Sequence, residues 1–154
     1  MSFSILNVVT EMPPYQIVLD TNVLLAGLRS NRGASYKLLT LLNDSRWQLN
    51  VSTALIFEYE EVLKRERIQL GLSIEDIDAV ISAICAIANR RSIFYLWRPT
   101  AHDPDDDFLI DLAVESQTDF IITYNKRDLQ AAANFAIQLV TPKEFLQIVG
   151  EIER

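Results

Sequence analysis

Short apolar runs alternate with helical segments along most of this chain, and this order limits the fold more than any other feature. The runs have the length and composition of buried strands, and they lie at 15–19, 47–51, 93–97, 119–123 and 137–140. Strands that alternate with helices form parallel βαβ units, with helices on both faces of the sheet. We therefore expect an α/β fold, an α/β/α sandwich around a small, four- to five-stranded, mainly parallel sheet.

Capping residues mark two of the expected helix starts. Ser73 and Asp76 form a capping-box pattern before a long stretch with helical spacing, and Thr141 and Glu144 form another before the last helix. A further helix is expected over about 53–67, directly after the second strand.

The length of 154 residues suits a single domain. Pro13 and Pro14 separate a leader, residues 1–14, from the expected domain at 15–150. Fourteen Lys and Arg stand against 21 Asp and Glu, which gives a formal net charge of -7. A chain this acidic is not a general polyanion-binding surface, so contact with nucleic acid would need a local basic patch or a bound metal ion.

The scarcity of cysteine and histidine excludes several kinds of site. One cysteine, Cys85, excludes a disulfide framework and a cysteine-built zinc site, and one histidine, His102, excludes a multi-histidine metal site. No apolar run approaches the ~20 residues of a membrane span, and the N-terminus lacks the basic start of a signal peptide. We expect a cytoplasmic protein that does not enter a membrane.

Acidic and amide side chains follow four of the five expected strands. Asp20 follows the first strand, Glu58 lies in the second turn of the helix after the second, the acidic run 103–107 follows the third, and Asn125 and Asp128 follow the fourth. Ligands of parallel sheets bind beyond the carboxyl ends of the strands, so these residues are the candidates for a site. For Asp20 a turn or a helix N-cap is the alternative, although an anion buried there is costly unless it is paired or holds a cation.

The helix after the second strand offers three glutamates. Its apolar residues form one arc, made of Leu55, Ile56, Tyr59, Val62 and Leu63. Glu61 points away from this arc, whereas Glu58 and Glu60 border its two edges. Periodicity does not choose between Glu58 and Glu60, and either could be a rim residue paired with a nearby Lys or Arg.

The run 103–107 places four carboxylates within five residues. The dipole of the following helix favours acids at its start by ~0.3–1 kcal/mol each, which accounts for one or two of them. Four indicate a cation-binding face, because Mg²⁺ and Mn²⁺ prefer oxygen ligands. We expect Asp106 in the first helical turn, facing the strand ends. Asn125 or Asp128 could either cap the next short helix or complete the acidic cluster.

A few further residues have two open interpretations. Phe57 falls on the outer face of its helix and is a candidate for a protein interface. Five basic residues could contact backbone phosphates, although solvated helix ends explain them equally well: Lys64, Arg65, Arg67, Arg90 and Arg91.

Four segments, taken in order, resemble the PIN-domain nucleases: 17–26 (IVLDTNVLLA), 52–65 (STALIFEYEEVLKR), 103–113 (DPDDDFLIDLA) and 120–129 (FIITYNKRDL). The greatest likeness is to the bacterial branch regarded as toxins of toxin–antitoxin pairs. The resemblance covers about residues 15–146. Each motif alone is weak, but four in this order, each after its expected strand, are specific.

The resemblance implies a cluster of three or four acids that binds Mg²⁺ or Mn²⁺ and cleaves single-stranded or structured RNA by metal-assisted hydrolysis. The first family acid matches Asp20 and the second matches Glu58, which selects among the glutamates. The third matches Asp106, with Asp103 as a helper. Either Asp106 or Asp128 would orient the attacking water.

The fourth acidic position of the family is where this chain departs. Many members carry Asp there, and this chain carries Asn125, with Asp128 as a candidate substitute and both as possible participants in the site. Thr21, Asn22 and Thr123 are candidates to hold the carboxylates or the water. The resemblance also implies RNA as substrate, an antitoxin protein as partner, and a homodimer.

The sequence thus predicts a metal-dependent endoribonuclease, the toxin of a toxin–antitoxin pair. Two alternatives are weighed against it. A phosphotransferase similar to the haloacid dehalogenases would use Asp20 as nucleophile, but it needs a second Asp where Asn22 stands. A catalytically silent PIN module that binds RNA or a partner protein is kept open by Asn125.

Overall fold

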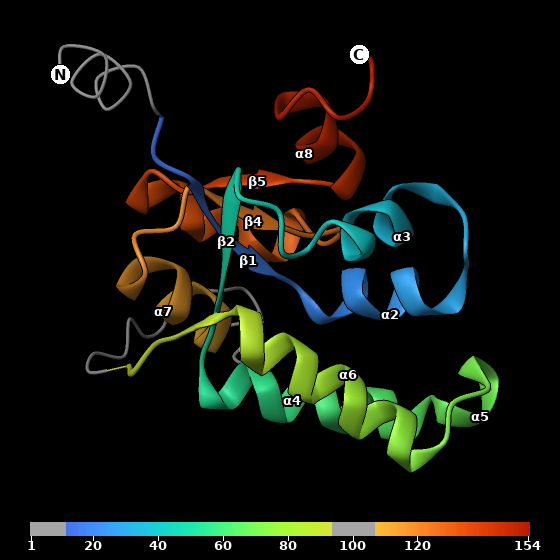
Figure 1. The fold of residues 1–154 in the computed structure, drawn as a ribbon. Coiled ribbons are helices and arrows are strands. Elements are labelled where there is room, and N and C mark those ends of the chain that lie inside the picture. The colour runs from blue at the N-terminus through green and yellow to red at the C-terminus, as the bar shows by residue number, and fades with distance from the viewer. Residues whose placement is uncertain (1–11, 94–106) are drawn as a thin grey trace, which may run out of the picture.

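The computed structural model describes residues 12–93 and 107–154, and its strands form one parallel sheet (Figure 1). The strands are β1 (Tyr15–Leu19), β2 (Trp47–Val51), β3 (Asn89–Arg90), β4 (Phe120–Ile122) and β5 (Gln138–Val140). Their order across the sheet is β3-β2-β1-β4-β5, and every pairing is parallel. The predicted α/β class and small parallel sheet are confirmed.

Helices flank the sheet on both faces. They are α2 (Thr21–Arg29), α3 (Gly33–Thr40), α4 (Thr53–Arg65), α5 (Arg67–Leu70), α6 (Ile74–Ile87), α7 (Asp107–Glu115), the 3-10 helix η2 (Arg127–Phe135) and α8 (Pro142–Ile148). In Figure 1, α8 lies on one side of the sheet, and α4 and α7 lie on the other. Phe145 of α8 packs edge-on against Trp47 and Phe120, with ring centroids 5.2 and 5.7 Å away. No helix in the described part of the chain is long and apolar enough to cross a membrane.

The central strand β1 sets the edge at which the candidate site forms. Its last three residues, 17–19, are fully buried, as expected for an apolar strand with helices on both faces. Ile17 lies opposite Leu49 of β2, and Leu19 lies opposite Ile122 of β4. The carboxyl ends of the three strands therefore meet at one edge of the sheet, and the residues that follow them become neighbours.

Two predicted elements differ from the structure. The third strand of the structure is Asn89–Arg90, directly after α6, which the sequence did not predict; the strand expected at 93–97 lies, except for Ile93, outside the described residues. The backbone N–H of Arg91 donates to the carbonyl of Val51 at 2.8 Å, so polar residues extend this edge of the sheet. The second difference is at 21–29, where the structure has α2; of the two alternatives for Asp20, a turn or a helix N-cap, the residue occupies the N-cap position.

The predicted helix starts are confirmed. Ser73 and Asp76 exchange both hydrogen bonds of a capping box at the start of α6, at 3.0 and 2.9 Å. Thr141 and Glu144 do the same for α8, at 3.1 and 2.8 Å. Ser52 caps α4. Each cap satisfies backbone N–H groups that the first turn leaves unpaired.

Candidate active site

Asp20 lies at the C-terminal end of β1, in the N-cap position of α2, and only 7% of its surface is exposed. Oδ2 accepts a hydrogen bond of 2.7 Å from the hydroxyl of Thr123. Burial raises the pKa of Asp20 above its usual value, and hydrogen bonding from Thr123 and from the backbone N–H groups of Thr21 and Asn22 opposes this rise. The central strand therefore ends in a carboxylate whose ionised form is costly without a cation.

Thr123 joins Asp20 to the loop after β4. Its side chain is fully buried, and its hydroxyl accepts a hydrogen bond of 2.8 Å from the backbone N–H of Asn125 while it donates to Asp20. The oxygen thus accepts from Asn125 through one of its lone pairs, and its single proton is donated to the carboxylate. Thr123, a predicted candidate for holding a carboxylate or the water, thus lies in contact with Asp20.

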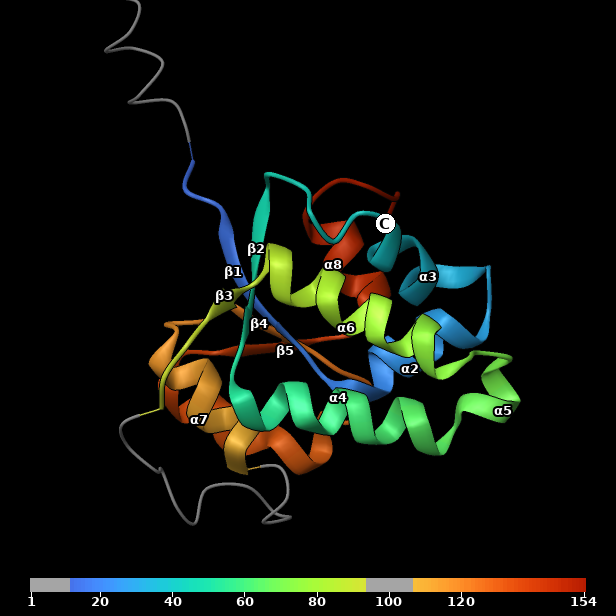
Figure 2. The ribbon, with the colours of Figure 1, turned by 60° about the horizontal axis from the view of Figure 1, so that its bottom comes forward.

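Glu58 is the glutamate of α4 that the fold connects to Asp20. The hydroxyl of Thr21, the residue after Asp20, donates a hydrogen bond to Oε2 of Glu58. Figure 2 shows α4 running past the N-terminal end of α2, which places the second turn of one helix beside the first turn of the other. Two threonine hydroxyls, from Thr21 and Thr123, thus each hold one of the two carboxylates.

The other two glutamates of α4 form ion pairs along their own helix. Glu60 contacts Lys64 at 2.8 Å, and Glu61 contacts Arg65 at 3.9 Å. The side chain of Glu61 is 76% exposed, as the helical periodicity predicts. These pairs follow the (i, i+4) spacing that links oppositely charged residues on a helix surface.

Tyr59 is a further part of the site that the sequence did not single out. Its side chain is fully buried in α4, and its hydroxyl donates a hydrogen bond to the carbonyl oxygen of Leu19. Burial raises the pKa of Tyr59 well above its usual value, and the negative charges of Asp20 and Glu58 add to the rise. The phenol therefore stays protonated, and it lies close enough to both carboxylates to interact with their charges. In the sequence Tyr59 looks like one more residue of an apolar arc.

Three predicted site residues have no side-chain link to these hydrogen bonds. Asn22 is exposed on α2, Asn125 is half-buried, and Asp128 is half-buried in the first turn of η2. Among the described residues, none of the three side chains forms a hydrogen bond or an ion pair. Asn125 contributes through its backbone N–H alone, which donates to Thr123.

The predicted third ligands, Asp103 and Asp106, lie outside the described residues. Within 12–93 and 107–154, no three His, Cys, Asp or Glu side chains lie close enough together to hold a metal ion. Asp20 and Glu58 nevertheless supply hard carboxylate oxygens, and no Lys or Arg of the described segments forms an ion pair with Asp20. This donor pair fits Mg²⁺ or Mn²⁺, which commonly use one or two protein carboxylates and complete their shell with water and phosphate oxygens.

Asp111 on α7 is a buried acid that the sequence did not single out. Asp111 is only 1% exposed, although it belongs to the acidic and apolar segment that begins at residue 103. The signal that could have revealed it is its place among Ile110 and Leu112, both fully buried on the same helix. An acid between two core residues is unusual, because burial disfavours a charge.

Comparison with known proteins supports this interpretation of the fold. A family model described as PIN domain matches residues 16–127, which is well over half of the chain. The match includes Asp20, Glu58 and Thr123, together with their supporting residues Thr21 and Tyr59. A search of curated proteins found no match. The chain belongs to the PIN-domain nuclease family.

Proposed function

We propose that this protein is a metal-dependent endoribonuclease that hydrolyses RNA phosphodiester bonds, and that it is the toxin of a toxin–antitoxin pair. Its chemistry would take place at Asp20 and Glu58, with Asp106 as the third acid and Asp103 and Asp128 beside them. Mg²⁺ or Mn²⁺ would be the cofactor. The antitoxin, a homodimer and a cytoplasmic location are part of the same proposal, and they rest on the resemblance to the toxin branch.

The observation that carries this proposal is the state of Asp20. Its carboxylate is almost fully buried, its pKa is raised by that burial, and the groups that support it, the hydroxyl of Thr123 and the first backbone N–H groups of α2, are neutral. A carboxylate kept in such a place costs the fold free energy, and a divalent ion is the partner that would offset this cost. Glu58, connected through Thr21, supplies a second carboxylate for the same ion.

The protein groups divide the work between them. Asp20 and Glu58 would hold the ion, which lowers the pKa of a bound water and neutralises phosphate charge when it is present. Thr21 and Thr123 fix the directions of the two carboxylates, because each donates its hydroxyl proton to one of them. Tyr59 anchors α4 to the end of β1 and keeps the carboxylates at a constant separation.

The test is cleavage of a labelled single-stranded RNA with Mg²⁺ or Mn²⁺, with and without excess chelator. We expect metal-dependent cleavage that Asp20→Asn and Glu58→Gln abolish. Matched controls are Asp78→Asn on α6 and Glu61→Gln on α4, which make the same chemical changes at exposed positions. Cleavage that persists in chelator, or that survives Asp20→Asn, would refute the proposal.

A second candidate is a catalytically silent PIN module that binds RNA or a partner protein. Asn125 favours it, because this neutral side chain stands where many members of the family carry an acid. Calorimetry distinguishes the two: a silent module binds no divalent ion near millimolar metal, whereas the nuclease binds one and loses it in Asp20→Asn.

A further inference from the structure

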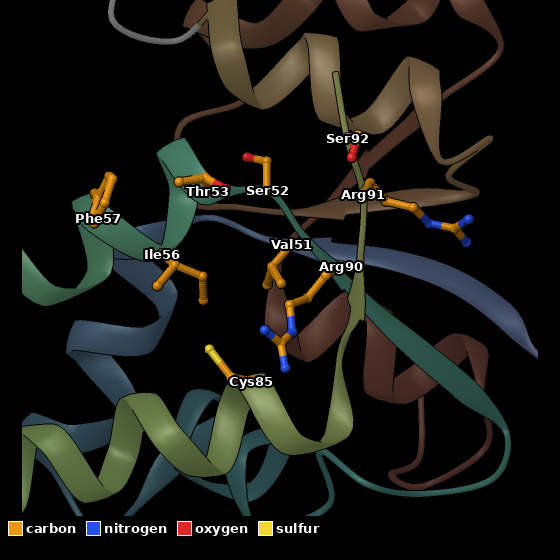
Figure 3. A pocket seen from close by; sticks show the side chains of 9 residues that line it. All are labelled: Val51, Ser52, Thr53, Ile56, Phe57, Cys85, Arg90, Arg91 and Ser92. Atoms are coloured by element: carbon orange, nitrogen blue, oxygen red, sulfur yellow. The ribbon is translucent and has the colours of Figure 1, made fainter. Parts of the chain in front are cut away.

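A hollow lies between the start of α4, the ends of β2 and β3, and α6 (Figure 3). It has a volume of about 220 Å³. Val51, Ile56 and Cys85 give it an apolar lining, and Phe57 stands at its rim with 65% of its surface exposed. Figure 3 shows the guanidinium group of Arg90 turned into this hollow. The pocket therefore joins an apolar wall, an exposed aromatic ring and a cation.

The two arginines at the end of β3 have different tasks. Arg91 points away from the pocket in Figure 3, and its Nε donates to Oδ1 of the fully buried Asn50 at 2.9 Å. Arg90 is exposed and points the other way, as alternate residues of an extended chain do. Within the described segments Arg90 forms no ion pair, although acids outnumber bases in the whole chain by 21 to 14. Arg91 thus stabilises the sheet through its hydrogen bond to Asn50, whereas the guanidinium group of Arg90 is available to bind a ligand.

The pocket adjoins the acidic site on the β3 side. Val51 of β2 lies opposite Arg90, and β2 is the direct neighbour of β1, which ends at Asp20. Two strand spacings of ~4.8 Å separate β3 from β1, so the pocket lies about 10 Å from the acidic site. On α4, Phe57 directly precedes Glu58. If a linear polymer of phosphodiesters placed one phosphate at the acids, the adjacent monomer would reach this pocket.

We infer that the pocket holds one nucleotide of a single-stranded nucleic acid, next to the phosphate that reacts. Arg90 contacts a backbone phosphate, and the ring of Phe57 stacks on the base. Exposed aromatic rings combined with cations are the common means of binding single strands, because every base has a face that can stack. A duplex is a poorer fit, since its bases are already stacked on one another. The inference rests on the proposed function for the position of the reacting phosphate.

Binding of a short fluorescein-labelled oligouridine tests the inference, measured by anisotropy in Mg²⁺ with the Asp20→Asn protein, so that the strand stays intact. We expect Phe57→Ala to weaken binding about 5- to 10-fold without a change in its salt dependence. We expect Arg90→Ala to weaken binding and to reduce the slope of log affinity against log salt by about 0.7 to 1. Arg90→Lys restores most of the slope.

The controls are Lys143→Ala and Ile68→Ala, which remove an exposed cation on α8 and an exposed apolar side chain on α5. Both should bind as the parent does, and circular dichroism checks that every variant is folded. Equal binding by Phe57→Ala, Arg90→Ala and the controls overturns the inference, as does tighter binding of a duplex than of the single strand. Binding to no nucleic acid at all overturns it as well.

The same experiments separate this inference from the proposed function. If the native protein cleaves RNA with metal while the pocket variants bind like the controls, the nuclease stands and the pocket assignment fails. If the strand binds through Phe57 and Arg90 but is never cleaved, the pocket stands and the nuclease fails. If a protein partner occupies this face instead, oligouridine affinity will not respond to either pocket substitution, and the inference fails.

Discussion

Tyr59 donates its buried hydroxyl to the carbonyl oxygen of Leu19, and this bond fastens the helix that carries Glu58 to the strand that ends before Asp20. The two carboxylates come from segments 38 positions apart, so their relative position depends on how α4 is attached to β1. Apolar contacts between a helix and a sheet are non-directional and do not fix the position of a helix by themselves. The phenol supplies the directional contact.

Removing this hydroxyl should weaken both the fold and the site. We expect Tyr59→Phe to lower the free energy of unfolding by about 1–2 kcal/mol, because a buried carbonyl loses its partner, and to reduce cleavage by loosening Glu58 relative to Asp20. Urea denaturation and RNA cleavage measure the two effects. Tyr36→Phe is the control, because that tyrosine lies on α3 and is 40% exposed. An unchanged stability of Tyr59→Phe would contradict the anchoring role.

The buried charge of Asp20 should make the metal-free protein less stable than a neutral variant. We expect Asp20→Asn to raise the Tm without metal, and each kcal/mol relieved should add about 2–4 °C in a domain of this size. Metal should then stabilise the native protein by about 1.4 kcal/mol at tenfold excess over its Kd, and should leave Asp20→Asn unchanged. Differential scanning fluorimetry across a metal titration measures both. A lower Tm for the metal-free Asp20→Asn protein would show that the charge of Asp20 does not destabilise the fold.

Thr123 should be required for its hydroxyl rather than for its shape. Thr123→Val keeps the volume but removes the bonds to Asp20 and to the N–H of Asn125, so it should cost about 2 kcal/mol of unfolding free energy. It should also raise the pKa of Asp20 further, since the hydrogen bond now lowers it. Thr123→Ser keeps the hydroxyl and should recover most of the loss in a urea titration. An equal loss of unfolding free energy in Thr123→Val and Thr123→Ser would show that packing, and not the hydroxyl, causes the effect.

The pH dependence of stability should include a contribution from Asp44, before β2. The side chain of Arg46 donates to both carboxylate oxygens, at 2.9 and 2.8 Å, and lowers the pKa of Asp44 from 3.8 to about 2. The folded state therefore binds this proton less tightly than the unfolded state. The stabilisation is complete above pH 3.8 and is lost as the pH falls through about 2.

Comparing the native protein with Asp44→Asn in urea at several pH values isolates this contribution. The difference in unfolding free energy should be about 1 kcal/mol or less near neutrality, because the pair lies at the surface, and it should shrink towards zero across the acid window. A difference that stays constant with pH would mean that the charge of Asp44 is not involved.

The sequence predicted the parts of the fold that depend on local signals. Apolar runs located β1, β2, β4 and β5, and the capping boxes at Ser73 and Thr141 located two helix starts. It missed the position of β3, because Asn89 and Arg90 pair with β2 through backbone groups and carry no apolar pattern. It missed α2, because the side chains after Asp20 suit a turn as well as a first helical turn.

The candidate site shows the same division. Asp20 could be predicted as a site residue because it directly follows a strongly apolar strand. Helical periodicity, in contrast, did not distinguish Glu58 from Glu60, since both border the apolar arc of their helix. Their difference arises from a tertiary contact, the hydroxyl of Thr21, which has no counterpart in the local pattern of α4. The opposite directions of Arg90 and Arg91 likewise depend on Asn50 in another strand. Such choices are made by packing partners far away in the chain.

The strand order has a consequence for when the site can first exist during synthesis. β1 lies between β2 and β4, and β4 is the later of these two partners to leave the ribosome. Until residue 123 has emerged, Asp20 lacks the hydroxyl that holds it and one of the two strands that bury it. A nascent chain that carries both Asp20 and Glu58 is therefore still incomplete at this edge of the sheet until β4 has been made and has paired with β1.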